Sequence, residues 1–152
     1  MPLVSEKPIF TIHSPLGAIQ KLGTTPYGER RIIDIHGGTV EGARLKGKVL
    51  PGGADWQIVR SDGVVHLQAR YTIETESGGK VLVDAEGYRH GPAEIMDRLA
   101  RDETVDEGLY YFRTFMRFET SDPAAAWLNR ILAIGKGARM KGAVRIDVFE
   151  VL

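Results

Sequence analysis

Short runs of alternating apolar and polar residues, separated by glycines, extend along most of the chain. The runs are rich in Val, Ile, Tyr and Phe, and their regular spacing is typical of an all-β sandwich or barrel. The longest run contains Gly42 and Gly47, so we expect it to bend there. The pattern predicts strands over Ile9–His13, Arg31–Ile35, Gly38–Leu50, Trp56–Arg60, Val64–Thr75, Lys80–Arg89, Leu109–Glu119, Arg130–Ile134 and Ala143–Val151.

Two short helices interrupt this pattern. Pro92 suits a first helical position, and Ile95 and Leu99 then fall on one face. Asp122 can cap a second helix that begins at Pro123. We interpret these helices as plugs or lids of a barrel, with simple connectors as the alternative. The sequence therefore predicts one domain over residues 1–152, an all-β antiparallel β-barrel of roughly eight to ten strands with one or two short helices.

The first clear hairpin surrounds Asp62-Gly63, which is a strong signal for a two-residue turn. Such a turn pairs Ser61 with Val64 and places Asp55 opposite Arg70. Side chains alternate between the two faces of a strand, so this register predicts two sets of residues. The core face would hold Trp56, Ile58, Val65, Leu67, Ala69 and Tyr71, and the other face Asp55, Gln57, His66, Gln68 and Arg70.

The second hairpin turns at Ser77-Gly78-Gly79, for which we favour a three-residue loop. This loop pairs Glu76 with Lys80, so Arg70 lies opposite Glu86 and Gln68 lies opposite Tyr88. The two hairpins predict a polar row in which Arg70 stands between the carboxylates of Asp55 and Glu86. Antiparallel sheets commonly have one solvated face, so an exposed row is one interpretation. A row of fixed charges inside a lumen, facing a ligand, is the other.

Further candidates lie towards the C-terminus. On one strand Tyr111, Arg113 and Glu119 share a side that could bind an anionic or hydroxylated ligand, while Phe112 and Met116 share the core side. Trp127 and Asn129 have the mixed character of a pocket rim, although packing is the usual role of a tryptophan.

Composition narrows the classes of function. The 152 residues contain 20 Lys and Arg against 20 Asp and Glu, so the balance of charge favours neither nucleic acid nor membrane as a partner. The absence of cysteine excludes disulfides and thiolate metal sites. No membrane-length apolar run or signal peptide is recognisable, so we expect a cytoplasmic protein. The four histidines lack metal-ligand spacing, and no phosphate loop or serine nucleophile elbow occurs, so we expect neither metal nor cofactor.

Several segments resemble a bacterial family known as domain of unknown function 3237. They are Gly37–Gly42, Gly47–Trp56, Ala69–Thr72, Tyr111–Arg113, Phe118–Thr120 and Trp127–Arg130, and the resemblance runs from about Gly23 to the C-terminus. The resemblance implies a small, soluble, antiparallel β-barrel, and it brings no catalytic residues with it. Where the family often has Asp-Ala-Arg-Tyr, this chain has Gln68-Ala69-Arg70-Tyr71, so an acid of the family pattern is missing here.

Three functions remain open. The favoured one is a cofactor-independent lyase or isomerase acting on a small oxygenated or aromatic metabolite. Asp55 or Glu86 would be its general base, and Arg70 with Tyr71 or Arg113 would stabilise an anion. Its expected mark is a deep pocket that contains a carboxylate with a perturbed pKa. Residues expected to bind substrate are Trp56, Gln68, Tyr71, Tyr88, Tyr111, Arg113, Glu119, Trp127 and Asn129.

The second function is a non-enzymatic barrel that binds a small ligand, with polar groups only at its mouth. Its lumen would be lined by Trp56, Tyr71, Phe112, Met116 and Phe118. The third is an interaction module that forms a homo-oligomer through strand edges or the polar row.

Overall fold

A computed structural model describes residues 1–152, and its sheet contains 11 strands. The strands are β1 (Phe10–Pro15), β2 (Ile19–Thr25), β3 (Gly28–Ile35), β4 (Thr39–Glu41), β5 (Gly47–Val49), β6 (Gly53–Val59), β7 (Val65–Thr75), β8 (Lys80–His90), β9 (Tyr111–Thr120), β10 (Ala133–Met140) and β11 (Ala143–Glu150). The helical elements are α1 (Ala93–Ala100) and the 3₁₀ helices η1 (Glu107–Leu109) and η2 (Pro123–Arg130). No helix has both the length and the apolar character needed to cross a membrane.

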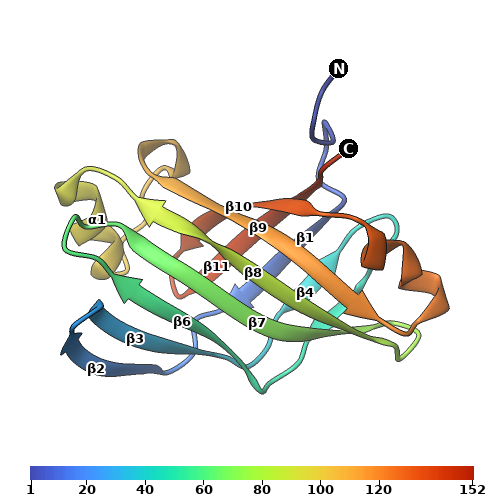
Figure 1. Cartoon of the computed structure of the whole chain (residues 1–152), viewed down its shortest axis with the longest axis horizontal. Helices are drawn as coiled ribbons and strands as arrows, with labels where there is room; N and C mark the ends of the chain where they lie inside the picture. Colours follow the sequence, from blue (N-terminus) through green and yellow to red (C-terminus); the bar gives the residue numbers. More distant parts are fainter.

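Eight of the strands close into an antiparallel barrel, which confirms the predicted fold class. Around the barrel they run in the order β7-β5-β4-β1-β11-β10-β9-β8, and the pairing of β7 with β8 closes the circle. Strands β7, β8 and β9 form the front wall in Figure 1, and β1, β4 and β11 lie behind them.

The remaining strands, β2, β3 and β6, form a branch from β7. The first half of β7 pairs with β6 from Val65 to Arg70, whereas its last three residues pair with β5. Strand β3 continues the branch beyond β6, and β2 is its outer edge. The lumen therefore has an opening where the branch and the strands β5, β4 and β1 separate.

Both predicted helices pack on the barrel core. Ile95 and Leu99 of α1 lie in a buried cluster with Val65 and Leu67 of β7, at the left end of the barrel in Figure 1. At the other end, Leu128 of η2 is fully buried in the larger apolar cluster. The expected cap of this second helix is present, because the Asp122 side chain accepts a hydrogen bond from the Ala124 N–H.

The strand predictions hold for most of the chain but miss three features. The run Gly38–Leu50 is interrupted more strongly than a bend, forming the separate short strands β4 and β5. Strand β10 continues to Met140 instead of ending at Ile134. Strand β2 was not predicted, because nearly all its residues are exposed and no apolar face marks it.

The predicted register of the β6–β7 hairpin is wrong by one residue. The Gly63 N–H donates to the Arg60 oxygen over 3.0 Å, and the Arg60 N–H donates to the Val64 oxygen over 2.9 Å. The loop therefore has three residues and ends on Gly63, whose φ of +85° suits glycine. A slip of one residue turns a strand over, so Asp55 lies opposite Ala69 instead of Arg70.

The β7–β8 hairpin has the predicted faces but a shifted register. Its three-residue loop is Glu76–Gly78, which pairs Glu74 with Lys80. This shift of two residues preserves which side chains point inward. Arg70 consequently lies opposite Asp84, and Gln68 lies opposite Glu86.

Candidate functional site

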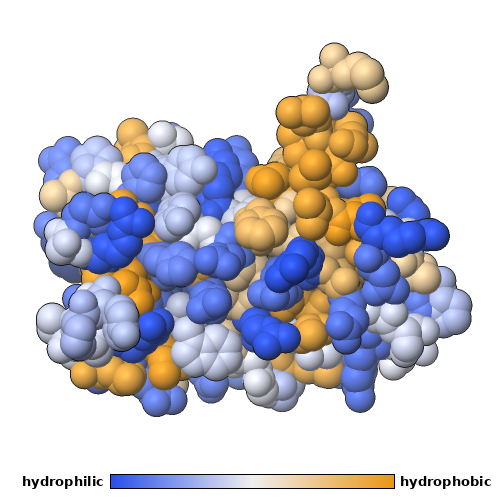
Figure 2. Space-filling model, in the orientation of Figure 1, coloured by the Kyte–Doolittle hydropathy of each residue, from blue (hydrophilic) through white to orange (hydrophobic).

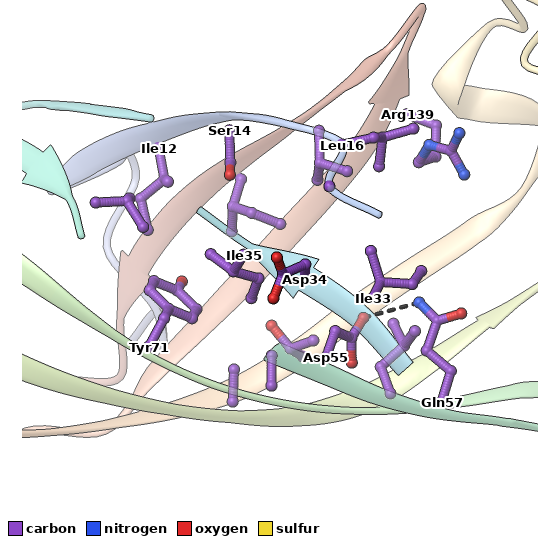
Figure 3. A pocket seen from close by; sticks show the side chains of 18 of the residues that line it. Ile12, Ser14, Leu16, Ile33, Asp34, Ile35, Asp55, Gln57, Tyr71 and Arg139 are labelled. Carbon is purple, nitrogen blue, oxygen red and sulfur yellow. Dashed lines mark hydrogen bonds between the residues drawn. The ribbon is translucent and has the colours of Figure 1, made fainter. Parts of the chain in front are cut away.

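A mostly apolar cavity lies in the barrel lumen next to the branch. It has a volume of about 110 Å³, and Figure 3 shows side chains of the barrel and of the branch converging on it. Its mouth is marked by the β1–β2 connection at Pro15–Gly17 and by the exposed Asp34 of β3. The walls are mostly apolar and include Ile33, Leu67 and Phe112.

Asp55 is the carboxylate in the centre of this cavity. The corrected register turns it inward from β6, beside Ile33 of β3. Its Oδ2 accepts a hydrogen bond of 2.8 Å from Gln57 Nε2, drawn as a dashed line in Figure 3. Gln57 Oε1 accepts one of 2.8 Å from Arg31 Nη2, so an amide links the arginine to the carboxylate.

A break in the β6–β7 ladder gives Asp55 a further donor. Strand pairing is present at Asp55–Ala69 and resumes at Ile58–His66. Between these pairs the Gln68 backbone N–H donates to Asp55 Oδ1 over 3.1 Å. The carboxylate is thus fixed by two protein donors, one on each oxygen, which is the kind of preorganisation that a catalytic acid or base requires.

Burial shifts the pKa values of the ionisable groups in the lumen. It raises the pKa of Asp55, and the hydrogen bond from Gln57 and the charges of Arg89 and Arg31 only partly oppose this. Burial, with a smaller contribution from the Asp55 charge, also raises the pKa of the Tyr71 phenol. Burial, together with the charges of Arg139 and Arg31, lowers the pKa of Arg89 to about 10.

Asp55 and Tyr71 are the predicted site residues that line the cavity. In Figure 3 Asp55 lies between Tyr71 at one end of the pocket and Arg139 at the other. Tyr71 is buried on the core face, as the sequence indicated. The pocket therefore contains an ionisable carboxyl group and a phenol that remains protonated at neutral pH.

The other two predicted catalytic residues point away from the lumen. Glu86 is exposed on the outer face of β8, where its Oε1 lies 2.8 Å from His66 Nε2. Arg70 lies on the outer face of β7, in the same row as Asp84. The polar row built around Asp55, Arg70 and Glu86 does not form, because the register slip moves Asp55 to the inside of the barrel.

Several predicted substrate-binding residues also lie outside. The side chains of Gln68, Tyr88, Tyr111 and Glu119 are exposed, and Trp56, turned over with Asp55, is 37% exposed. Tyr88 contacts the His66 ring, Tyr111 stacks on His90, and the half-buried Arg113 lies over the Tyr111 ring. Figure 2 shows mostly hydrophilic side chains on the surface at the α1 end of the barrel. These residues form the solvated face of an antiparallel sheet.

Trp127 and Asn129 have structural contacts in η2. Trp127 packs against the main core, with the Arg44 guanidinium 3.8 Å from its ring centroid. Asn129 pairs with the backbone of Thr120 through two hydrogen bonds, one accepted and one donated. Neither residue lines the lumen cavity.

The sequence interpretation missed the arginines of the site. Arg89 continues the inward alternation of Val81, Val83 and Ala85, so the strand parity already indicated its direction. Arg139 was missed because the predicted strand ended at Ile134, whereas β10 continues to Met140. The inward positions of β10 that precede it include Gly135 and Gly137, which have no apolar side chains to mark a core face.

The comparisons with known proteins identify the family. The chain matches the family described as "Protein of unknown function (DUF3237)" over residues 4–151. The chain belongs to this family. The match begins nearer the N-terminus than the expected Gly23. A protein named "UPF0311 protein" from Rhodopseudomonas palustris strain TIE-1 is 45% identical over 151 residues, which cover 99% of each chain.

Solved structures give the same result for the fold. The crystal structure of the conserved protein of unknown function RPA1785 from Rhodopseudomonas palustris is 43% identical and has a TM-score of 0.91. The match covers 100% of this chain and 99% of that one. A structure described as an enzyme from Penicillium herquei is 18% identical, with a TM-score of 0.73 and coverage of 100% and 97%. At that identity the likeness shows a shared fold alone.

Proposed function

We propose that the lumen is the active site of a cofactor-independent lyase or isomerase that moves a proton on a small oxygenated or aromatic metabolite. The observation that carries this proposal is the position of Asp55, a fixed carboxyl group with a raised pKa inside a mostly apolar cavity. General bases are most effective when their pKa lies near the working pH, and burial shifts Asp55 in that direction. Glu86 and Arg70 have no part in this site.

The reaction begins with a C–H bond next to a carbonyl group. Asp55 accepts the proton, the electron pair of the C–H bond forms a C=C bond, and the π pair of the carbonyl group moves to its oxygen to give an enolate. Tyr71, which stays protonated, can donate a hydrogen bond to this oxygen and so stabilise the anion. In an isomerase, Asp55 returns the proton to another carbon conjugated with the enolate, and the carbonyl group re-forms. In a lyase, the carbonyl group re-forms as the bond from the neighbouring carbon to its leaving group breaks, and the leaving group departs with the electron pair of that bond.

A purely binding barrel is the competing function. It predicts polar groups only at the mouth and a lumen lined by Trp56, Tyr71, Phe112, Met116 and Phe118. Tyr71, Phe112 and Met116 do line the cavity, whereas Trp56 is 37% exposed and Phe118 lies in the core. The polar side chains of Asp55, Gln57 and Arg89 line the cavity as well, which a purely binding barrel does not predict. This distribution of polar groups favours chemistry over simple retention of an apolar ligand.

The proposal is tested by solvent exchange. Small ketones such as acetophenone and cyclohexanone are incubated with the protein in D₂O, and loss of their α-proton signals is followed by NMR. We expect exchange above the buffer rate with the wild type and a loss of at least about 100-fold for Asp55→Asn, since general base catalysis contributes roughly 10²–10⁴.

The matched control is Asp84→Asn, which removes a carboxylate from the outer face of β8. We expect this variant to exchange at the wild-type rate. If the wild type does not exceed the buffer rate with any ketone, the enzymatic proposal fails. Equal rates for the wild type and Asp55→Asn would exclude Asp55 as the base.

A further inference from the structure

The guanidinium of Arg89 is a buried charge without an ion-pair partner in the protein. Arg89 is only 6% exposed and lines the cavity at the end of β8. Its Nε has no hydrogen-bond partner in the protein, and no carboxylate lies within ion-pair distance of its side chain. Its nearest aromatic neighbour is Phe112, whose ring centroid is 5.5 Å from the guanidinium carbon.

The other arginines of this region are held differently. Arg139 Nη2 lies 3.4 Å from Asp102 Oδ1, and Arg31 donates to the Gln57 amide. Arg89 thus has two cationic neighbours and a distant carboxylate, Asp55, as its principal counter-charge. A buried charge without a partner is costly, so a residue of this kind indicates an anion that arrives with a ligand.

The acidic groups of the cavity lie elsewhere. Asp34 stands at the exposed mouth and Asp55 in the centre, whereas Arg139 lies at the end opposite Tyr71 in Figure 3. Arg89 and Arg139 give that end of the lumen a positive character. Apolar side chains surround it, including Leu67, Val144 and Ile146.

We propose that the substrate of the lumen site is a small carboxylate and that Arg89 binds its carboxylate group. A guanidinium presents paired N–H donors that match a planar carboxylate, so one free arginine suffices for this anion. The apolar walls then hold the hydrocarbon part of the molecule. An apolar cavity of about 150 Å³ holds benzene, so the volume of about 110 Å³ suits a short branched chain, and a ring fits by extending into the open mouth.

The statement that the bound carboxylate is a substrate rests on the proposed function, whereas the test below measures binding only. Benzoate is the probe, and benzamide is its neutral counterpart of the same shape. Isothermal titration calorimetry of the wild type at pH 7 should give benzoate a dissociation constant at least about tenfold lower than that of benzamide.

The decisive variant is Arg89→Met, which removes the charge and keeps an apolar side chain of similar length. We expect it to lose the tenfold preference for benzoate and to bind benzamide as the wild type does, which also reports an intact pocket. Arg89→Gln gives a second neutral variant if the methionine variant does not fold. The control is Arg117→Met, which removes an exposed arginine of the outer face and should keep the preference.

Three results would overturn the inference. They are equal binding of benzoate and benzamide to the wild type, an unchanged preference in both Arg89 variants, and tighter binding of phenyl phosphate than of benzoate. If ketone exchange fails while benzoate binding depends on Arg89, the enzymatic proposal falls and the carboxylate site stands. If ketone exchange succeeds while substitution of Arg89 does not change benzoate binding, the carboxylate site falls and the enzymatic proposal stands.

Discussion

Asp55 combines two opposed influences in one side chain. Hydrogen bonds from Gln57 and from the Gln68 backbone favour its ionised form, and burial in the lumen favours its neutral form. Burial is the larger influence, so the folded protein holds the Asp55 proton more tightly than the unfolded chain does. A carboxyl group in this position costs stability when ionised, and such a cost is common at functional sites.

The stability of Asp55→Asn should therefore depend on pH relative to the wild type. Because the folded pKa is raised, the contribution of Asp55 to the free energy of unfolding is fully present below the unfolded pKa and is lost as the pH rises through the folded pKa. Asparagine does not titrate. As the pH rises above about 4, the ordinary pKa of an aspartate, the difference in free energy of unfolding should shift in favour of the variant.

Urea unfolding of both proteins at a series of pH values measures the shift. A difference that stays constant with pH, or that moves in favour of the wild type as the pH rises, would mean that burial does not raise the pKa of Asp55.

At the scale of the elements, one turn decides which residues form the site. Apolar alternation was sufficient to predict most strands and both helices, because each of those segments has a distinct buried face. In β6 the apolar pattern favoured the wrong face. Trp56 and Ile58 look like core residues in the sequence, but Asp55 and Gln57 are the side chains that point into the lumen. The missing information was the loop length at Gly63, because glycine is equally suited to two-residue and three-residue turns.

The consequence for the site was large. Tyr71 was correctly placed on the core face because β7 has a long and regular pattern. Asp55 lines the lumen, but the predicted register gave it the wrong partner and the wrong side of the sheet. The alternation along β8 already indicated that Arg89 points inward, whereas no such pattern marked Arg139, because glycines precede it on the inward side of β10.

The three-residue loop makes a prediction that distinguishes it from a two-residue turn. The hydrogen bond from the Gly63 N–H to the Arg60 oxygen places Ser61 second in a β-turn, where proline is favoured. In the two-residue register the Ser61 N–H would instead belong to the ladder. Ser61→Pro should therefore be neutral or stabilise by about 0.5–1 kcal/mol in urea unfolding.

Gly63→Ala is the companion variant. It should destabilise the protein by about 1–2 kcal/mol, because a residue with a Cβ is strained at a φ of +85°. No atom lies close to the added Cβ, so neither a clash nor a new contact changes this cost. Proline costs roughly 3 kcal/mol where the N–H of the residue it replaces is needed for a hydrogen bond. A loss of stability of about 3 kcal/mol or more in Ser61→Pro would therefore contradict the observed register.

At the scale of the whole molecule, the branch from β7 makes the barrel suitable for a ligand. A closed barrel of eight strands has an interior just wide enough for side chains to fill. Here β5 and β6 share one edge of β7, so the wall divides and the branch covers additional space beside the core. The cavity is lined from both sides of this division, by Ile12 and Val49 of the barrel and by Ile33 and Asp55 of the branch.

Helical elements close the two ends of the barrel. Helix α1 and the 3₁₀ helix η2 cover its two ends, as Figure 1 shows. A ligand would therefore enter from the side, between the branch and β1, past Pro15 and Asp34. The buried polar groups lie beyond this entrance.

The central claim is that function resides in the lumen and not on the outer polar face. A crystal structure of the protein saturated with benzoate tests it most directly. The account predicts benzoate inside the barrel, with its carboxylate oxygens about 3 Å from the guanidinium of Arg89 and its ring beside Asp55. Benzoate bound only on the outer face beside Arg70 or Arg113, with none in the lumen, would contradict it.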